Sequence, residues 1–155
     1  MPKVALGATV PDFSLPATGG GTFRLKEGSG RPLVLYFYPK DMTSGCTRES
    51  QDFRDLHSAF RKAGTEVVGI SRDSLAAHEK FKAKEHLPFA LLSDEDERVC
   101  RLFDVIREKS LYGRKYLGIE RSTFLIDAKR VLRKEWRKVK VPGHAEEVLE
   151  AARSL

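Results

Sequence analysis

The clearest hydrophobic pattern in the chain is an apolar run followed by a helical repeat. Residues 33–38 read Leu-Val-Leu-Tyr-Phe-Tyr, a length typical of a buried strand, and Pro39 ends the run. After a short polar loop, apolar residues recur at three- and four-residue steps up to Gly64, which predicts a helix over residues 46–62. Cys46 therefore lies in the first turn of this helix, where free backbone N–H groups and the positive end of the helix dipole are found.

The rest of the chain alternates between segments with strand and helix patterns. Two short strands at 13–15 and 22–25, separated by three glycines, predict an N-terminal β-hairpin. The remaining predicted strands are 66–70, 90–93, 122–126 and 131–136, and the remaining helices are 74–86, 95–104 (capped by Asp94) and 143–153. A βαβ unit followed by a β-hairpin and a helix predicts a mixed sheet with helices on both faces. This α/β arrangement fits a thioredoxin-like fold in one domain spanning residues 1–155.

Composition narrows the class of protein. The 155 residues carry two cysteines and contain no apolar run long enough for a signal peptide or a membrane span. We therefore expect a cytoplasmic protein without disulfide staples and with no membrane partner. The formal net charge is +6, and the most basic stretch, residues 133–140, alternates charges as a solvated strand face does, so we expect no nucleic-acid partner.

The position of Cys46 favours a reactive sulfur, because the thiolate is the nucleophilic form and a helix N-terminus stabilises it. Ionising most of a free thiol at neutral pH takes roughly 2.7 kcal/mol, whereas a helix end supplies typically about 0.3–1 kcal/mol and about 2 at best. A cation is needed as well. Arg48 points about 200° around the helix from Cys46, so the cation should come from another element. Glu49 shares the face of Cys46 and is a candidate to hold that cation in place. The alternative is a buried structural thiol.

The loop before Cys46 adds to the chemical interpretation. Pro39, Thr43 and Cys46 form the pattern P-x-x-x-T-x-x-C between a buried strand and a helix. A threonine hydroxyl and the backbone N–H groups around Gly45 could hold a peroxide while a thiolate attacks its O–O bond and negative charge develops on the departing oxygen. Each residue alone has a simpler interpretation: the threonine as a turn hydroxyl and the proline as the end of a strand.

The motifs resemble a known family. The loop segment PKDMTSGCTRE is similar to the active-site motif of the peroxiredoxins, and three further segments resemble their bacterioferritin comigratory protein, or peroxiredoxin Q, subgroup: GATVPDFSLPA, KSLYGRKYLGIERSTFLID and WRKVKVPGHAEEVLEA. The resemblance implies a thiol-dependent peroxidase in which Cys46 is the peroxidatic cysteine and Pro39, Thr43 and Arg121 complete the site. It also implies that no cofactor or metal is needed and that a thioredoxin- or glutaredoxin-type donor re-reduces the enzyme, which we expect to be a monomer or a dimer.

Two positions depart from the family pattern and leave the resolving step open. Ser44 stands where the family usually has proline, and Gln51 stands where many members carry a second cysteine. The helical pattern places Cys100 at the boundary between core and solvent, so Cys100 is a possible resolving residue that condenses with the Cys46 sulfenic acid. Otherwise Cys46 works alone and an external thiol reduces it.

Other functions find less support in the sequence. A thiol–disulfide oxidoreductase would normally use Cys-x-x-Cys, but position 49 is Glu. A Cys–His hydrolase is disfavoured because His57 follows Cys46 by three helical turns. A non-catalytic redox sensor or chaperone-like thiol protein on the same fold is the alternative. Tyr112 and Tyr116 either cover the active site as part of a loop or make ordinary packing contacts. Zinc-ligand spacing is absent around the four histidines, His57, His78, His86 and His144.

Overall fold

The fold is organised around one fully buried strand. The computed structural model describes residues 3–28 and 30–155. In β3 (Leu33–Phe37) every residue is buried, as its continuous apolar sequence predicts. Leu35 and Phe37 pack into a hydrophobic cluster on one side, whereas Val34 and Tyr36 pack into a second cluster on the other side. Because successive side chains of a strand point to opposite faces, the two clusters are the two faces of the sheet.

The central sheet has seven strands in the order β2-β1-β5-β4-β3-β8-β9. β3 pairs in parallel with β4, and β4 with β5, whereas β8 and β9 continue the sheet antiparallel and β1 and β2 form an N-terminal hairpin. The predicted mixed sheet and hairpin of a thioredoxin-like fold are confirmed. The strands other than β3 are β1 (Ser14–Ala17), β2 (Gly21–Arg24), β4 (Glu66–Ser71), β5 (Leu91–Ser93), β8 (Ser122–Ile126) and β9 (Leu132–Trp136).

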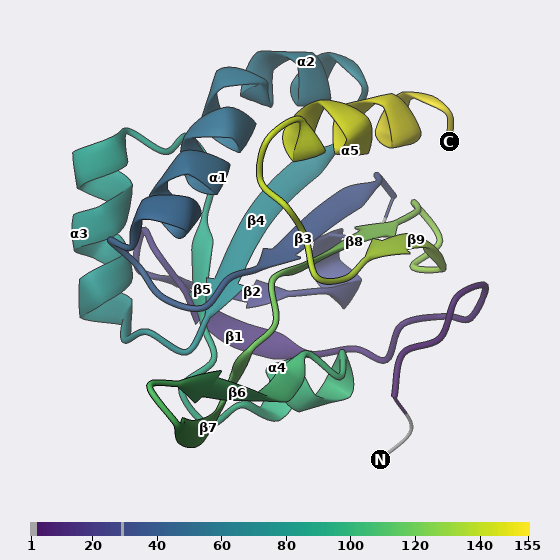
Figure 1. The fold of residues 1–155 in the computed structure, drawn as a ribbon. Helices are drawn as coiled ribbons and strands as arrows, with labels where there is room; N and C mark the ends of the chain where they lie inside the picture. The colour runs from purple at the N-terminus through teal and green to yellow at the C-terminus, as the bar shows by residue number, and fades with distance from the viewer. Residues whose placement is uncertain (1–2, 29) are drawn as a thin grey trace.

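Helices cover both faces of this sheet (Figure 1). One face carries α1 (Ser44–Asp55), α2 (His57–Lys62), α3 (Leu75–Glu85) and α5 (His144–Arg153). The other face carries the short α4 (Arg98–Leu102) and a separate hairpin of β6 (Ile106–Leu111) and β7 (Arg114–Ile119); a 3-10 turn, η1, spans Lys26–Gly28. None of the helices in the described part of the chain is long and apolar enough to cross a membrane.

Three predicted elements differ from the observed ones. The helix expected over 46–62 begins at Ser44 and is divided at Leu56, where the backbone (φ −97°, ψ 2°) leaves helical geometry although the apolar repeat continues. The helix expected over 95–104 is only α4, because the Asp94 carboxylate accepts the N–H groups of Val99 and Cys100 and the chain turns at Glu97 (φ 64°). The β6–β7 hairpin was expected to be a loop, and it exposes most of its side chains.

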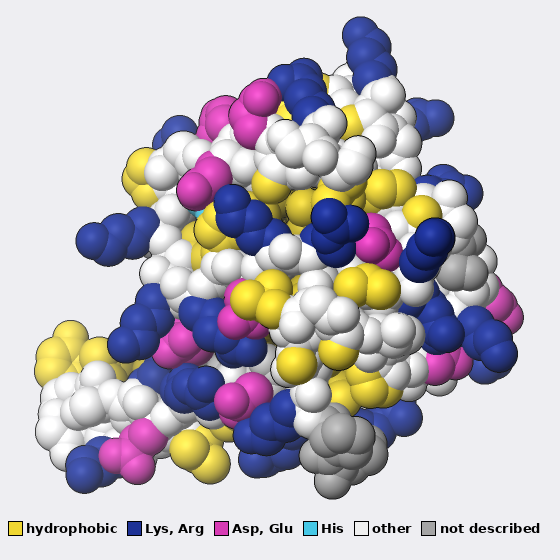
Figure 2. Space-filling view, turned by 90° about the vertical axis from the view of Figure 1, so that its right-hand side faces the viewer, with side chains coloured by type: hydrophobic (Ala, Val, Ile, Leu, Met, Phe, Trp, Pro, Cys, Tyr) yellow, Lys and Arg dark blue, Asp and Glu magenta, His cyan; other side chains and the backbone are white. Residues whose placement is uncertain are grey.

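Three basic residues on and just after β9 make contacts within the protein. Arg133 pairs with Asp127 at 3.2 Å, and Lys134 lies 5.2 Å from the ring centroid of Trp136. Arg137 donates to two backbone carbonyl oxygens that follow α4. Figure 2 shows Lys and Arg side chains spread over one face of the molecule with acidic side chains among them. This arrangement favours a solvated, mixed-charge surface on that face.

Candidate active site

Cys46 lies where the buried strand β3 passes into α1. It is the third residue of α1, and the helix hydrogen bonding begins with the Thr47 N–H donating to the Thr43 carbonyl oxygen at 2.8 Å. The free N–H groups of this first turn and the helix dipole therefore face the region of the sulfur. Cys46 itself is only 1% exposed, and the neighbouring Thr43 and Ser44 are exposed. The sulfur is therefore covered in this structure, and Thr43 and Ser44 are exposed residues close to it in the chain.

Arg121 supplies a cation to Cys46 from 75 residues further along the chain. Its Nη2 donates to Cys46 Sγ at 3.2 Å, and its Nη1 donates to Glu49 Oε1 at 2.6 Å. The sheet register explains this approach, because Phe37 at the end of β3 is paired with Ser122 at the start of β8. Arg121 immediately precedes that pair, so its side chain emerges at the edge of the sheet where the Cys46 loop lies.

Gly45 leaves room for the guanidinium. A Cβ atom at Gly45 would lie 3.1 Å from Nη2 of Arg121, a closer approach than ordinary side-chain contacts. The absence of a side chain at Gly45 therefore allows the guanidinium of Arg121 to approach the first turn of α1 and to reach the sulfur. Glycine is needed here for space and not for its backbone freedom, because Gly45 lies in the first turn of the helix.

Glu49 holds Arg121 from the buried side of the site. It follows Cys46 by three residues, on the same face of α1, and is 1% exposed. Burial raises the pKa of Glu49 to about 7, although the charge and hydrogen bond of Arg121 oppose this shift. Burial alone would lower the pKa of Arg121, but Glu49 and Cys46 raise it above its ordinary value, so Arg121 is a permanent cation. Within the described residues, Glu49 Oε2 is buried and has no hydrogen-bond partner.

The other loop residues are close to Cys46 in the chain but make their own contacts. The Thr43 hydroxyl donates to the Lys40 carbonyl oxygen at 2.8 Å, which is the turn contact considered as its simpler interpretation. Pro39 is half-buried directly after β3. Ser44, in place of the usual proline, is the first residue of α1. The catalytic roles of Thr43 and Pro39 stay predictions.

Position 51 has a structural contact. Gln51 Nε2 donates to Glu85 Oε1 at 2.7 Å and so joins α1 to the last residue of α3. A second thiol is therefore replaced here by a polar link between two helices on the same face of the sheet.

Cys100 lies in a different core from Cys46. It is 0% exposed, and the predicted position at the boundary between core and solvent is wrong. The error arises because α4 has only five residues and is fixed by Asp94, so its orientation does not follow from a long helical repeat. Burial and the Asp94 carboxylate raise the pKa of the Cys100 thiol far above its usual range. Cys46 and Cys100 belong to the clusters on opposite faces of the sheet.

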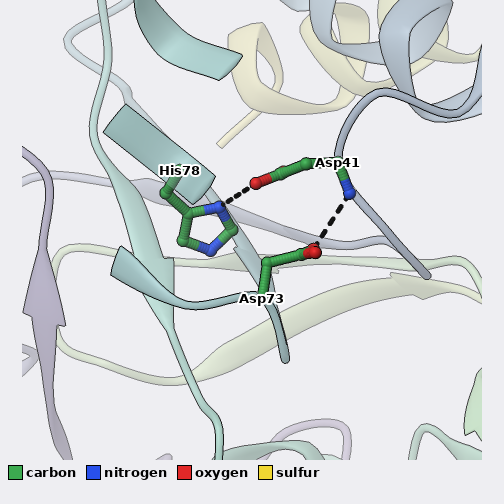
Figure 3. Close-up of side chains that lie close together, drawn as sticks. All are labelled: Asp41, Asp73 and His78. Atoms are coloured by element: carbon green, nitrogen blue, oxygen red, sulfur yellow. Dashed lines mark hydrogen bonds and ion pairs between the residues drawn. The ribbon is translucent and has the colours of Figure 1, made fainter. Parts of the chain in front are cut away.

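One cluster was not anticipated from the sequence. Asp41, Asp73 and His78 lie together beside the Cys46 loop (Figure 3), and within the described residues they are the one group whose ligand atoms are close enough to hold a metal, all within 4.8 Å of one another. His78 and Asp41 are buried and hydrogen-bonded to each other. No sequence motif joins these three residues, because they come from three segments that only the fold brings together.

Comparisons with known proteins agree with this architecture. The AhpC/TSA family model matches residues 6–135. The chain is 47% identical over 152 residues to peroxiredoxin Bcp of Bacillus subtilis, covering 98% of this chain and 97% of the relative. It is 50% identical over 149 residues to peroxiredoxin Bcp of Xanthomonas campestris, covering 96% of this chain and 93% of the relative. A solved structure of the Xanthomonas campestris bacterioferritin comigratory protein superimposes with a TM-score of 0.90 at 48% identity, covering 97% of this chain and 96% of that one. The chain therefore belongs to the AhpC/TSA family and, within it, to the Bcp, or peroxiredoxin Q, type of peroxiredoxins.

Proposed function

We propose that Cys46 is the peroxidatic cysteine of this peroxiredoxin and that Arg121, Thr43 and Pro39 complete its active site. The observation that carries the proposal is the guanidinium of Arg121, which donates to the Cys46 sulfur and the Glu49 carboxylate at once. A sulfur at a helix N-terminus with a permanent cation 3.2 Å away is stabilised as the thiolate. This combination meets the need for a cation that the helix end alone leaves open.

The chemistry follows from a thiolate next to hydrogen-bond donors. The sulfur attacks one oxygen of the peroxide, the S–O bond forms and the O–O bond breaks. The departing oxygen takes a proton and leaves as water or an alcohol, and Cys46 becomes a sulfenic acid. Arg121 and the first N–H groups of α1 stabilise the negative charge that develops on the oxygens. Pro39 and the Thr43 hydroxyl shape the loop before α1, which borders the site where the peroxide binds.

We infer that hydrogen peroxide and alkyl hydroperoxides are the substrates. The similar Xanthomonas campestris protein has an alkyl peroxide reduction activity. Thr43 and Ser44, three and two residues before Cys46, are exposed, and we propose that the alkyl group of a larger peroxide lies against them.

The second half-reaction uses a thiol from outside the chain. One external thiol condenses with the sulfenic acid and releases water, and a second thiol releases Cys46 as a disulfide forms between the two donors. Burial of Cys100 on the other face of the sheet favours this one-cysteine route over a Cys46–Cys100 disulfide. The donor is a thioredoxin- or glutaredoxin-type protein. Two free thiols suit a reducing cytoplasm, where we propose that the protein works as a monomer or a dimer.

Stopped-flow measurement of peroxide consumption tests the proposal. Wild type and a Cys100→Ser control should react with hydrogen peroxide in a fast second-order step, and Cys46→Ser should lose that step entirely. Equal rates for wild type and Cys46→Ser would overturn the assignment of Cys46. A Cys46–Cys100 disulfide found by mass spectrometry in wild type treated with one equivalent of peroxide would overturn the one-cysteine route.

A further inference from the structure

The start of the Cys46 loop is fixed by a buried hydrogen-bond network. Asp41 is 5% exposed, and its carboxylate accepts the hydroxyl of Tyr38 and lies 2.7 Å from Nδ1 of His78. The backbone N–H of Asp41 donates to the Asp73 carboxylate at 2.9 Å (Figure 3). The loop is therefore held at one residue by the end of β3, by α3 and by the segment between β4 and α3. We name Tyr38, Asp41, Asp73 and His78 the loop anchor.

The hydrogen-bond partners of the two His78 ring nitrogens show where protons are needed. His78 Nε2 lies 2.9 Å from the Leu92 carbonyl oxygen, which can only accept, so Nε2 carries a proton. Nδ1 faces the Asp41 carboxylate, which leaves one further proton between these two groups. Burial raises the pKa of Tyr38 well above its ordinary value, so its hydroxyl stays a donor to Asp41.

These contacts favour an anchor over a metal site. A metal at Asp41, Asp73 and His78 would have to replace the direct Asp41–His78 hydrogen bond and the donors on Asp73. The Asp73 carboxylate also accepts the Ser71 hydroxyl. Among the described residues, the buried side-chain oxygens and nitrogens left without a partner lie elsewhere, on Glu49 and Trp136. The cluster is therefore already satisfied by its own hydrogen bonds.

The anchor acts on the sulfur through a very short piece of chain. Asp41 precedes the first residue of α1 by three residues and Cys46 by five. Met42, between Asp41 and Thr43, has a φ of 67°, a conformation that L-residues rarely adopt and that persists only where neighbouring contacts enforce it. The loop anchor supplies those contacts on one side of Met42, and the Thr43–Thr47 hydrogen bond supplies them on the other.

We propose that Asp41 and His78 are positioning residues for the peroxide reaction, which fix the loop so that Thr43 and the first N–H groups of α1 meet the peroxide in line with the Cys46 sulfur. This inference rests on the proposed function of Cys46. It concerns the geometry of the oxygens, because Arg121 reaches the sulfur from the position before β8 and donates to Cys46 and Glu49, not to the anchor. The anchor therefore governs the reaction with peroxide more than the nucleophilicity of the thiolate.

Two reactions of the same sulfur separate these effects. Reaction with hydrogen peroxide needs the oxygens in line, whereas alkylation by iodoacetamide needs the thiolate alone. We expect Asp41→Asn and His78→Gln each to lower the peroxide rate constant about 10- to 100-fold, the range that a small misplacement of reacting groups can cause. The alkylation rate of Cys46, followed by mass spectrometry, should change by less than about threefold. Because the residues act as a pair, the double variant should be no slower than the slower single variant.

Two further variants guard against a trivial loss of structure. Tyr38→Phe keeps the packing and removes one hydrogen bond from Asp41, and should lower the peroxide rate about threefold to tenfold with alkylation unchanged. Phe103→Leu, in the core on the opposite face of the sheet, should lower the urea midpoint and leave both rates within about twofold of wild type.

The outcomes distinguish this inference from the proposed function. Peroxide rates within twofold of wild type in Asp41→Asn, His78→Gln and Tyr38→Phe, or peroxide and alkylation rates that fall in parallel, would overturn the positioning role. A peroxide reaction of Cys46→Ser as fast as that of wild type would overturn the proposed function itself. If the Asp41 and His78 variants fail to fold, the ratio of the two rates in Tyr38→Phe decides between the outcomes.

Discussion

Replacing Arg121 by glutamine should slow the peroxide reaction strongly. The substitution removes the guanidinium that donates to Cys46 Sγ at 3.2 Å and to Glu49 Oε1 at 2.6 Å. A hydrogen bond to a charged group contributes about 1.5–3 kcal/mol. If that contribution is lost from the thiolate and its transition state, the second-order rate constant should fall about 10- to 150-fold.

The same substitution should affect stability in a pH-dependent way. Burial raises the pKa of Glu49 from 4.5 to about 7, so the folded protein holds this proton more tightly than the unfolded chain does. In wild type, stability from this group is greatest below about pH 4.5 and falls as the pH rises to about 7. Arg121 lowers the pKa of Glu49, so its removal extends the fall above pH 7. At 1.36 kcal/mol per pH unit, the variant should lose little through Glu49 at pH 7 and up to about 2.7 kcal/mol by pH 9.

Urea denaturation at pH 7 and pH 9, together with stopped-flow rates, measures both effects. Arg48→Gln is the matched control, because Arg48 is near Cys46 in sequence but is paired with Asp52 on the surface. The control should keep the peroxide rate within about twofold of wild type, as for exposed ion pairs in general. A wild-type rate in Arg121→Gln, or an equal loss of unfolding free energy at both pH values, would refute the reasoning.

Three further outcomes are expected. Gly45→Ala should lower the peroxide rate severalfold, less than loss of Arg121 does, because the new Cβ would lie 3.1 Å from Nη2; unchanged rates would show that the guanidinium can move aside. Gly69→Ala should lower the free energy of unfolding by about 1–3 kcal/mol in urea denaturation, because its Cβ would lie 2.7 Å from the ring of Tyr36; a stability equal to wild type contradicts this. Cys100→Ala should turn over with an external thiol at the wild-type rate, and mass spectrometry of peroxide-treated wild type should find no disulfide within the chain; such a disulfide would restore Cys100 as the resolving residue.

The strand, loop and helix around Cys46 could be predicted because their signals are local. An apolar run that ends at Pro39 and a repeat that continues to Phe60 need no knowledge of the rest of the chain. The need for a distant cation also followed from energetics. The sequence pattern could not identify that cation, because the approach of Arg121 depends on the pairing of β8 with β3. Only the family resemblance pointed to this residue beforehand.

The errors occur where tertiary contacts override a local pattern. Cys100 was placed at a boundary on the assumption of a long helix, whereas the Asp94 carboxylate holds a short one in the core. Tyr112 neither packs against the core nor covers the active site in this structure, since its side chain is 97% exposed at the turn of the β6–β7 hairpin. The pair of Asp41 and His78 is separated by 37 residues and could not be seen in any motif.

The placement of the two sulfurs on opposite faces of the sheet has a consequence for the cell. On the proposed one-cysteine route, the oxidised enzyme waits for a collision with a reduced donor while the sheet and α4 stay folded. Recovery is then bimolecular, and its frequency rises with donor concentration. Under sustained oxidant load, the protection that such an enzyme gives would follow the supply of reduced donor more closely than the number of enzyme molecules.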